Sequence, residues 1–124
     1  MKSSPRELKG VGVDLVQLSR AEKFLKQNRS PSVMRLFSKP EIAALRGKKL
    51  TPRIFAKFFS AKEAFFKASG GAWMGIEGFS NIDVKCLSRD RFKVRSFAGK
   101  KMKAAEGNFF RGRGWVGARL VLWK

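Results

Sequence analysis

Short apolar, β-branched runs alternate along this chain with stretches whose apolar positions recur every three to four residues. The run 11–18, VGVDLVQL, follows Gly10 directly and predicts a buried strand. Later in the chain the period changes to two, which predicts three strands, over 79–87, 91–97 and 115–123. Residues 88–90 form the predicted turn between the first two of these, and a loop over 111–114 precedes the last.

Helix-start signals, in which proline or a glutamate closely follows a serine or threonine, recur between the first strand and residue 70. They predict, in order, helices whose starts are marked by Ser19, Ser30, Ser38 and Thr51. Gly47 ends the third. The fourth is the longest, from residue 53 to 69, and Gly70 and Gly71 stop it. A further short helix is predicted over 100–106.

The long predicted helix has two unlike faces. At about 100° per residue, one arc of roughly 80° is polar and small. Its members are Arg53, Ala56, Ser60, Glu63 and Lys67. Most of the opposite side is apolar and is expected to enter the core; its members are Ile54, Phe55, Phe58, Phe59, Phe65 and Phe66. The pattern predicts a helix buried on one side and lined for a ligand on the other.

These elements predict an α+β fold in which a mostly antiparallel sheet packs against one long helix and shorter helices. The length of 124 residues suits one core, so residues 1–124 are interpreted as a single domain. No apolar run is long enough to cross a bilayer and no signal-peptide pattern is present, which predicts a cytoplasmic protein without membrane association. Cys86 is interpreted as a buried structural thiol. Because histidine is absent, histidine-based catalysis and histidine-ligated metals are excluded.

The net positive charge of the chain is extreme for its length. Lysine and arginine number 28 against nine acids, and the formal net charge is +19. Such a surface attracts polyanions before any specific contact forms. Nucleic acid, an anionic membrane, and an acidic protein or phosphorylated cofactor all fit this charge, so net charge alone does not select among them.

Four charged side chains stand out by position. Asp14 lies in the apolar strand, where it is either turned to solvent or a metal ligand. Glu63 and Lys67 have the spacing of a surface ion pair, but small neighbouring residues leave room for a ligand. Two carboxylates from different elements, with phosphate oxygens and waters, suit octahedral magnesium. Lys62 falls within the apolar arc, where it either snorkels to solvent or reaches a phosphate or carboxylate.

Two segments resemble a known family. Residues 10–20, GVGVDLVQLSR, are similar to the opening strand G-x-G-x-D-(I/L)-V-x-(I/L)-x-R of the holo-acyl-carrier-protein synthases, which are small 4′-phosphopantetheinyl transferases. Residues 53–67, RIFAKFFSAKEAFFK, resemble that family's R-x-x-A-x-R-F-x-x-K-E-A-x-x-K helix. The likeness continues through Gly70 to Phe79 and Asp83. Paired motifs at this spacing, in a chain of this length, make a specific match.

The resemblance implies magnesium-dependent transfer of 4′-phosphopantetheine from coenzyme A to a serine of apo acyl carrier protein, with release of adenosine 3′,5′-bisphosphate. It implies that Asp14 and Glu63 bind the magnesium ion together with the diphosphate of coenzyme A. Lys67 is expected to contact phosphate near the reacting centre, and Lys62 belongs to the same catalytic motif. Glu63 is expected to take the serine proton, directly or through a water molecule.

The same resemblance implies the partners. Lys67 and Gly70 are expected to contact coenzyme A, while Arg20 and, as a second candidate, Arg53 face the acidic recognition helix of the carrier protein. The family forms homotrimers with sites between subunits, so a homotrimer is expected here. Whether the carrier belongs to fatty acid biosynthesis or to a specialised pathway stays open.

The C-terminal third departs from the family pattern. Residues 108–111, NFFR, stand where the family commonly has a serine and a histidine. Arg111 or Arg113 is therefore a candidate for the 3′-phosphate of coenzyme A. Phe58 replaces a family arginine, and Ala72 replaces a glycine of the usual G-T-G turn.

Two alternatives remain at this point. A nucleic-acid-binding module would use the basic charge and the RGRG loop over 111–114, although it leaves Asp14 unexplained and the motifs of base-reading folds are absent. A relative that kept the fold but lost the activity would fit the altered C-terminal segment. The presence of Asp14, Lys62, Glu63 and Lys67 argues against that loss.

Overall fold

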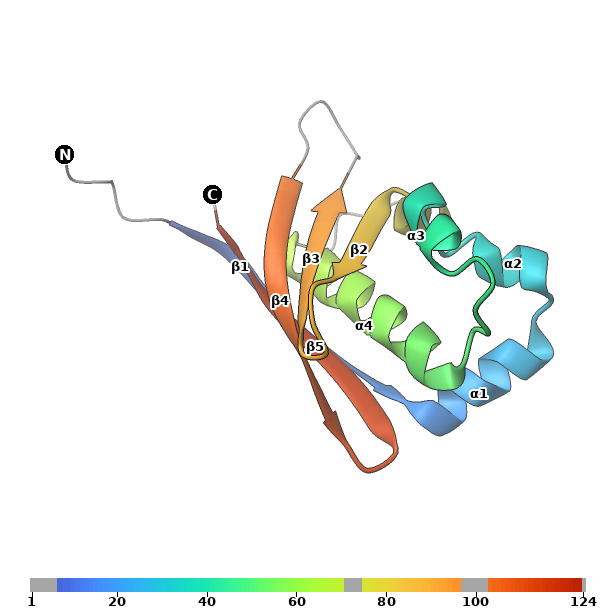
Figure 1. Ribbon diagram of the computed structural model, residues 1–124. Helices are drawn as coiled ribbons and strands as arrows, with labels where there is room; N and C mark the ends of the chain where they lie inside the picture. Colours follow the sequence, from blue (N-terminus) through green and yellow to red (C-terminus); the bar gives the residue numbers. More distant parts are fainter. Residues whose placement is uncertain (1–6, 71–74, 97–102, 124) are drawn as a thin grey trace.

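The computed structural model describes residues 7–70, 75–96 and 103–123. Its elements are β1 (Leu8–Gln17), α1 (Leu18–Gln27), α2 (Ser30–Met34), α3 (Lys39–Ala44), α4 (Pro52–Ala68), α5 (Gly75–Ser80), β2 (Ile82–Cys86), β3 (Arg91–Ser96), β4 (Lys103–Gly112) and β5 (Trp115–Trp123). Within this part, the strands form one antiparallel sheet in the order β1-β5-β4-β3-β2, and the helices lie on one of its faces (Figure 1). The predicted α+β fold class is confirmed.

Helix α4 lies along the sheet and makes the core with it. Its buried alanines and Phe65 pack against inward residues of the strands, among them Ile82, Phe92 and Leu120. A second cluster joins the N-terminal half of α4 to α1, α2 and β5 through residues such as Phe55 and Val33. The two clusters contain Phe55, Phe58, Phe59 and Phe65 of the predicted apolar side, but neither Ile54 nor Phe66.

Close contact between β1 and α4 depends on two glycines. A Cβ atom at Gly10 would lie 1.9 Å from the carbonyl oxygen of Ala68, and one at Gly12 would lie 1.7 Å from that of Ala64. No side chain fits at these distances, so glycine brings the two backbones together. This contact places Asp14, which points to the same side of β1 as Gly12, beside the middle of α4.

The predicted helix starts are mostly confirmed. Ser38 caps α3 in a complete capping box with Glu41, and Thr51 caps α4 through the backbone nitrogen of Ile54. The start predicted at Ser19 is wrong: α1 begins at Leu18, and its N-cap residue Gln17 makes no side-chain cap hydrogen bond. The chain therefore passes from β1 into α1 without a loop.

Two predicted elements differ. The helix predicted over 100–106 is wrong for residues 103–106. These residues belong to strand β4 and pair with Ser96 to Lys93 of β3. Residues 100–102 lie outside the described part. Strand pairing here overrides the helix propensity of the sequence KAAE. The strand predicted over 79–87 is shorter, since Phe79 lies in α5 and β2 begins at Ile82. The end predicted at Phe97 for the next strand and the stop at Gly71 also lie outside the described residues.

Two burial predictions are wrong. Cys86 is exposed at the end of β2 and is not a buried thiol. Strand β1 is buried on one side only: Val11, Val13 and Leu15 are 54%, 48% and 60% exposed. Since the helices cover a single face, the outer side of this edge strand has no partner within the described chain. None of the described helices combines the length and the hydropathy needed to span a membrane.

Candidate functional site

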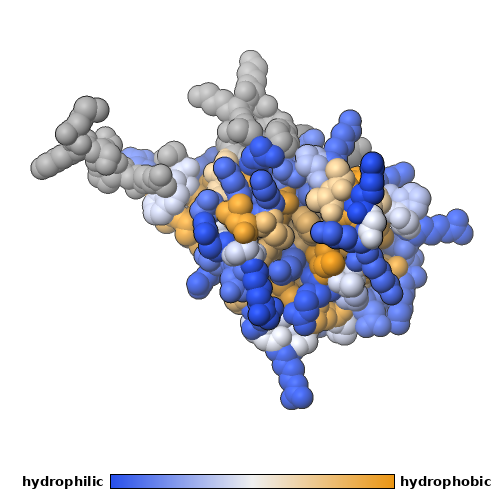
Figure 2. All heavy atoms as spheres, in the orientation of Figure 1, coloured by the Kyte–Doolittle hydropathy of each residue, from blue (hydrophilic) through white to orange (hydrophobic). Residues whose placement is uncertain are grey.

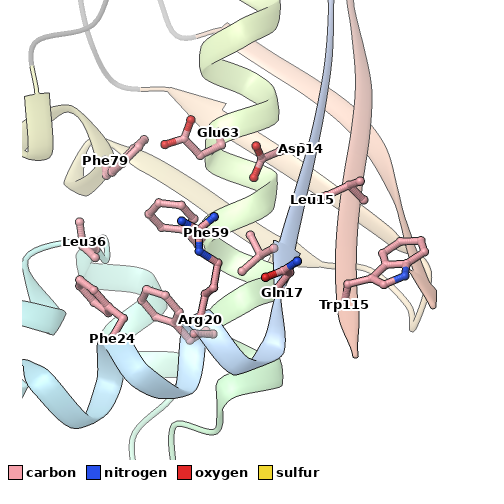
Figure 3. Close-up of a pocket in the computed structure, with 13 residues that line it drawn as sticks. Asp14, Leu15, Gln17, Arg20, Phe24, Leu36, Phe59, Glu63, Phe79 and Trp115 are labelled. Atoms are coloured by element: carbon pink, nitrogen blue, oxygen red, sulfur yellow. The ribbon is translucent and has the colours of Figure 1, made fainter. Parts of the chain in front are cut away.

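A cavity of about 690 Å³ lies between the end of β1, helix α1 and the middle of α4 (Figure 3). Most of its wall is apolar and includes Ala21, Phe24, Leu36, Phe55, Phe59 and Phe79. The polar lining is concentrated in Asp14 and Gln17 of β1, Arg20 of α1 and Glu63 of α4. The pocket therefore combines an apolar wall with a small group of charges, as substrate sites commonly do.

Asp14 is paired with Lys67. The ammonium nitrogen of Lys67 lies 3.0 Å from Asp14 Oδ1 and 3.1 Å from the carbonyl oxygen of Val13. The Asp14 side chain is 15% exposed and that of Lys67 is 50% exposed. Lys67 thus reaches across to the strand, so the interpretation of Glu63 and Lys67 as a simple pair along the helix surface is wrong.

Glu63 lies beside Asp14 (Figure 3) and interacts electrostatically with both Asp14 and Lys67. Partial burial, followed by repulsion from the Asp14 carboxylate, raises the pKa of Glu63, and the Lys67 ammonium opposes the rise. Two carboxylates from different elements converge here with oxygen donors only, which suits a hard divalent cation. Among the described residues, no three His, Cys, Asp or Glu side chains lie close enough together to bind one metal ion. Further oxygen ligands would therefore have to come from water or a substrate.

The other predicted contacts are more dispersed. Arg20 lines the pocket and is exposed, whereas Arg53 is exposed on the first turn of α4. Gly70 follows Ser69, the C-cap residue of α4, and has a positive φ of 90°, a conformation that favours glycine. Arg111 lies on β4, 3.0 Å from Asp90 Oδ1, and is not among the residues that line the pocket.

Lys62 does not enter the pocket. Its side chain is 2% exposed, and its nitrogen lies 2.6 Å from Glu41 Oε1. It also donates hydrogen bonds to the carbonyl oxygens of Leu36 and Phe79, at 2.6 and 2.8 Å. Lys62 therefore neither snorkels to solvent nor reaches Asp14 and Glu63, because it forms a buried ion pair with Glu41 of α3.

The polar arc of α4 is only partly a ligand face. Ala56 and Ser60, expected to leave room for a bound group, are fully buried and face protein. The Ser60 hydroxyl donates to the carbonyl oxygen of Lys57. Phe55 and Phe59, which lie in one i, i+4 row with Glu63, line the pocket instead. The helix is rotated relative to the prediction because it packs against both the sheet and the smaller helices.

Sequence reasoning missed two features of the site. The first is its aromatic wall, since Phe55 and Phe59 were assigned wholly to the core and Phe79 to a strand. The second is Glu41, which was recognised only as part of a helix-start signal. A signal did exist for the second: a lysine in an apolar helix face requires a carboxylate partner, and few acids are available in this chain.

Comparison with known proteins points to one family. The model of the 4′-phosphopantetheinyl transferase superfamily matches residues 10–116. The holo-acyl-carrier-protein synthase of Geotalea daltonii is 36% identical over 75 residues, which cover 60% of this chain and 60% of that protein. The synthase of Clostridium acetobutylicum is 38% identical, again over 60% of its length. That of Clostridium kluyveri is 36% identical over 101 residues, 81% of this chain and 74% of that protein.

Solved structures share the fold. The holo-acyl-carrier-protein synthase of Neisseria meningitidis superposes with a TM-score of 0.75 at 24% identity, covering 95% of this chain and all (100%) of that one. The synthase of Helicobacter pylori, solved in complex with coenzyme A, superposes with a TM-score of 0.71 at 22% identity, covering 90% of this chain and 98% of that one. At these identities the structures establish the fold alone.

Proposed function

The chain belongs to the 4′-phosphopantetheinyl transferase superfamily, and from this premise we propose that it is a holo-acyl-carrier-protein synthase. The proposed reaction transfers 4′-phosphopantetheine from coenzyme A to a serine of an apo acyl carrier protein and releases adenosine 3′,5′-bisphosphate. The observation that carries the proposal is the convergence of Asp14, Glu63 and Lys67 at one end of a pocket large enough for part of a cofactor.

In this reaction the serine oxygen attacks the phosphorus that bears the pantetheine arm, and the bond to the bridging oxygen of the diphosphate breaks. Adenosine 3′,5′-bisphosphate leaves with the bonding electrons. Catalysis of this kind depends mainly on positioning and on neutralising phosphate charge. Lys67 supplies a positive charge for a phosphate oxygen, and Glu63 accepts the serine proton. Partial burial, with repulsion from Asp14, raises the pKa of Glu63, and this supports the role because a carboxylate with a raised pKa is a stronger base.

Magnesium fits the residues present. Asp14 and Glu63 would hold the ion, and its chemistry when bound is to neutralise charge on the diphosphate. This fit is supported by the two neighbouring carboxylates, which repel each other and are partly offset by the Lys67 ammonium group. Lys67 would then turn from Asp14 to a phosphate, a short movement for a half-exposed side chain.

Further contacts to coenzyme A are proposed at Gly70 and Arg111. Gly70 exposes backbone at the end of α4, close in sequence to Lys67. Arg111 holds Asp90 in an exposed pair, which a phosphate could replace at little cost. An Arg111→Ala variant is expected to raise the KM for coenzyme A, and an unchanged KM would exclude this contact.

An acidic carrier protein suits the surface around the pocket. Hydrophilic side chains extend from much of the face seen in Figure 2. Arg20 lies at the pocket itself and Arg53 on the adjoining turn of α4; both are proposed to contact the carrier. Other exposed basic residues on the helical side are Arg29, Arg35, Lys39 and Arg46. With these substrates the protein would act in the cytoplasm.

A homotrimer is proposed as the working assembly. Its support is the outer face of β1 and β5, where Val11, Val13, Leu15 and Trp123 are all exposed. A row of apolar side chains on an edge strand and its neighbour is a surface that proteins usually cover. A second copy would also add a wall to the pocket, because Leu15 belongs to both the outer face and the pocket lining.

The test is to incubate the purified protein with apo acyl carrier protein, coenzyme A and magnesium, and to weigh the carrier by mass spectrometry. The expected result is a gain of one phosphopantetheine group that requires the metal. Chelator and an Asp14→Ala variant should abolish the gain. A Glu106→Gln variant is the matched control, because this exposed glutamate on β4 does not line the pocket and pairs with exposed Arg91 at 3.6 Å.

No gain with a carrier that a known synthase modifies would reject the proposal for that carrier. If further carriers also failed, the chain would be a relative that kept the fold without the activity. Modification that persisted in the Asp14→Ala variant or in chelator would reject the proposed magnesium site while leaving the transfer itself in place.

A further inference from the structure

The ammonium group of Lys62 is bound on all sides by the protein. Its three acceptors are Glu41 Oε1, the carbonyl oxygen of Leu36 and the carbonyl oxygen of Phe79. The nitrogen also lies 5.5 Å from the centre of the Phe37 ring. A buried ammonium group is costly unless each of its protons has an acceptor, and here each does. The arrangement is a built site rather than a chance contact.

Glu41 is equally satisfied. Besides Lys62, it accepts hydrogen bonds from the backbone nitrogens of Ser38, at 2.9 Å, and Val84, at 2.6 Å. The Ser38 hydroxyl in turn donates to Asp83 Oδ1 at 2.9 Å. The pair thereby joins four separate segments to α4: the α2–α3 connection, α3, α5 and β2. Groups from distant parts of the chain meet at one buried point.

Two of these anchored residues form the pocket wall that faces the catalytic carboxylates. Leu36 and Phe79 line the cavity, and Figure 3 shows them on the side away from β1. Lys62 holds the backbone of both. It also directly precedes Glu63 on α4, so the two residues point to different sides of one helical turn. The position of the wall relative to Glu63 therefore depends on the hydrogen bonds of Lys62.

We propose that Lys62 and Glu41 are positioning residues that set the width of the substrate pocket by fixing the Leu36 and Phe79 segments against α4. Lys62 acts through these segments and does not touch the reacting atoms. This inference rests on the proposed function, because it assigns the wall to substrate binding. It takes Lys62, the first lysine of the family-like helix motif, out of the catalytic group and makes it a positioning residue.

The decisive variant replaces both charges: Lys62→Met together with Glu41→Leu. Replacing a buried ion pair with apolar residues of similar size usually preserves stability, whereas removing one partner leaves a buried charge. The double variant is therefore expected to fold, but without the hydrogen bonds to the Leu36 and Phe79 carbonyls and without those from the Ser38 and Val84 backbone nitrogens. Lys57→Met is the matched control, since Lys57 lies on the same helix and contacts Phe109 and the Arg89 carbonyl away from the pocket.

In steady-state assays, the double variant should lose about 10- to 100-fold in kcat/KM, with most of the loss in the KM for coenzyme A or carrier. The Lys57→Met variant should match the wild type. A loss confined to kcat would mean that Lys62 acts on the reacting atoms. Wild-type kinetics in a stably folded double variant would mean that the pair serves stability alone. Either result overturns the inference.

Amide hydrogen exchange supplies a readout that does not require activity. Peptides covering 33–38 and 78–84 should exchange faster in the double variant than in the wild type or Lys57→Met, while 115–123 stays unchanged. If these exchange differences are found but the wild-type protein has no transferase activity, the proposed function is rejected, whereas the anchoring of the wall by Lys62 and Glu41 is retained. If the wild type is active and the double variant changes neither the exchange rates nor KM, the inference about Lys62 and Glu41 is rejected and the proposed function stands.

Discussion

At the level of single residues, the positions of three charged side chains, Asp14, Glu63 and Lys67, explain the chemistry of the site better than the net charge of the chain does. Only nine acids occur in this chain, yet two of them, Asp14 and Glu63, lie close enough to repel each other. One lysine, Lys67, partly offsets that repulsion from across the helix–strand contact. A protein keeps such a costly arrangement where a cation or a proton is to be bound. The remaining basic residues are mostly exposed.

A Glu63→Gln variant tests this directly. The folded-state pKa of Glu63 is raised above its unfolded value, so this group stabilises the fold at low pH, and the stabilisation is lost as the pH rises through the folded-state pKa. Without metal, the variant should therefore melt at a higher temperature than the wild type near neutral pH, and the difference should disappear at about pH 3. Calorimetric or spectroscopic melting curves at several pH values measure it.

The same variant should lose about 10²- to 10⁴-fold in turnover, as expected when a general base is removed. Glu106→Gln is the control for both experiments. A Glu63→Gln protein that bound magnesium normally and turned over at the wild-type rate would remove Glu63 from both proposed roles. A melting temperature that fell at neutral pH would contradict the repulsion inferred here.

At the level of elements, the contact between β1 and α4 determines where the proposed catalytic residues meet. The two motifs that resemble the family lie on these two elements, far apart in the sequence. Gly10 and Gly12 allow the backbones to touch, and the contact brings Asp14 of the strand beside Glu63 and Lys67 of the helix. The glycines of the first motif therefore serve the site, although they carry no chemistry of their own.

A Gly12→Ala substitution should destabilise the fold by about 3 kcal/mol or more, because the new methyl group would overlap the Ala64 carbonyl and the backbones would have to separate. Gly47→Ala is the matched control. Gly47 has a positive φ of 78° but open space around it, so only a backbone cost of about 1 kcal/mol is expected. Denaturant unfolding of both variants compares the costs, and equal values would contradict the proposed role of the close contact.

At the level of the whole molecule, the two faces of the sheet have different surroundings. Helices cover the inner face, whereas the outer face of β1 presents valines and a leucine to solvent in the single chain. The charged surface is the second global feature, with a net charge of +19 on 124 residues. The first feature suggests association between copies, and the second suggests an acidic partner. Each leads to a separate experiment.

A Val13→Glu variant should convert the proposed homotrimer to monomer. Val13 is 48% exposed and lies opposite Arg119 of β5, so a glutamate there pairs across the strands in the single chain but places charge in an apolar interface. Light scattering coupled to size-exclusion chromatography gives the mass. Ile42→Glu, at a 39% exposed position on α3, is the control and should keep the wild-type mass. A monomeric wild type would reject the trimer.

Salt should slow the reaction with the carrier protein. Electrostatic steering raises association rates by about 10- to 10³-fold at low ionic strength, so kcat/KM for the carrier should fall at least about tenfold between roughly 50 and 500 mM salt. An Arg20→Gln variant should show a shallower dependence than Lys85→Gln, which removes an exposed charge on β2 away from the pocket. Equal dependence in both variants would argue that Arg20 does not face the carrier.

Much of the fold, and the family resemblance of the two motifs, could be predicted from the sequence because both depend on local patterns. The strand around Asp14, the long helix, the hairpin turn before Arg91 and the final strand depend on local periodicity and on proline and glycine signals, and the structure confirms them. The family resemblance of the two motifs is confirmed by the match over residues 10–116. Helix α3 begins where its capping box predicted, because the box is a purely local interaction.

What the sequence could not determine depends on contacts between distant residues. Strand β4 forms because β3 and β5 pair with it, although part of its sequence favours a helix. Local pattern showed that Lys62 lies on an apolar helix face, but only the packing of α3 against α4 supplies Glu41 as its partner. The sequence by itself determined most of the elements and indicated Asp14, Glu63 and Lys67 as candidates; tertiary structure decided which residues meet, because burial and long-range pairing are properties of the folded chain.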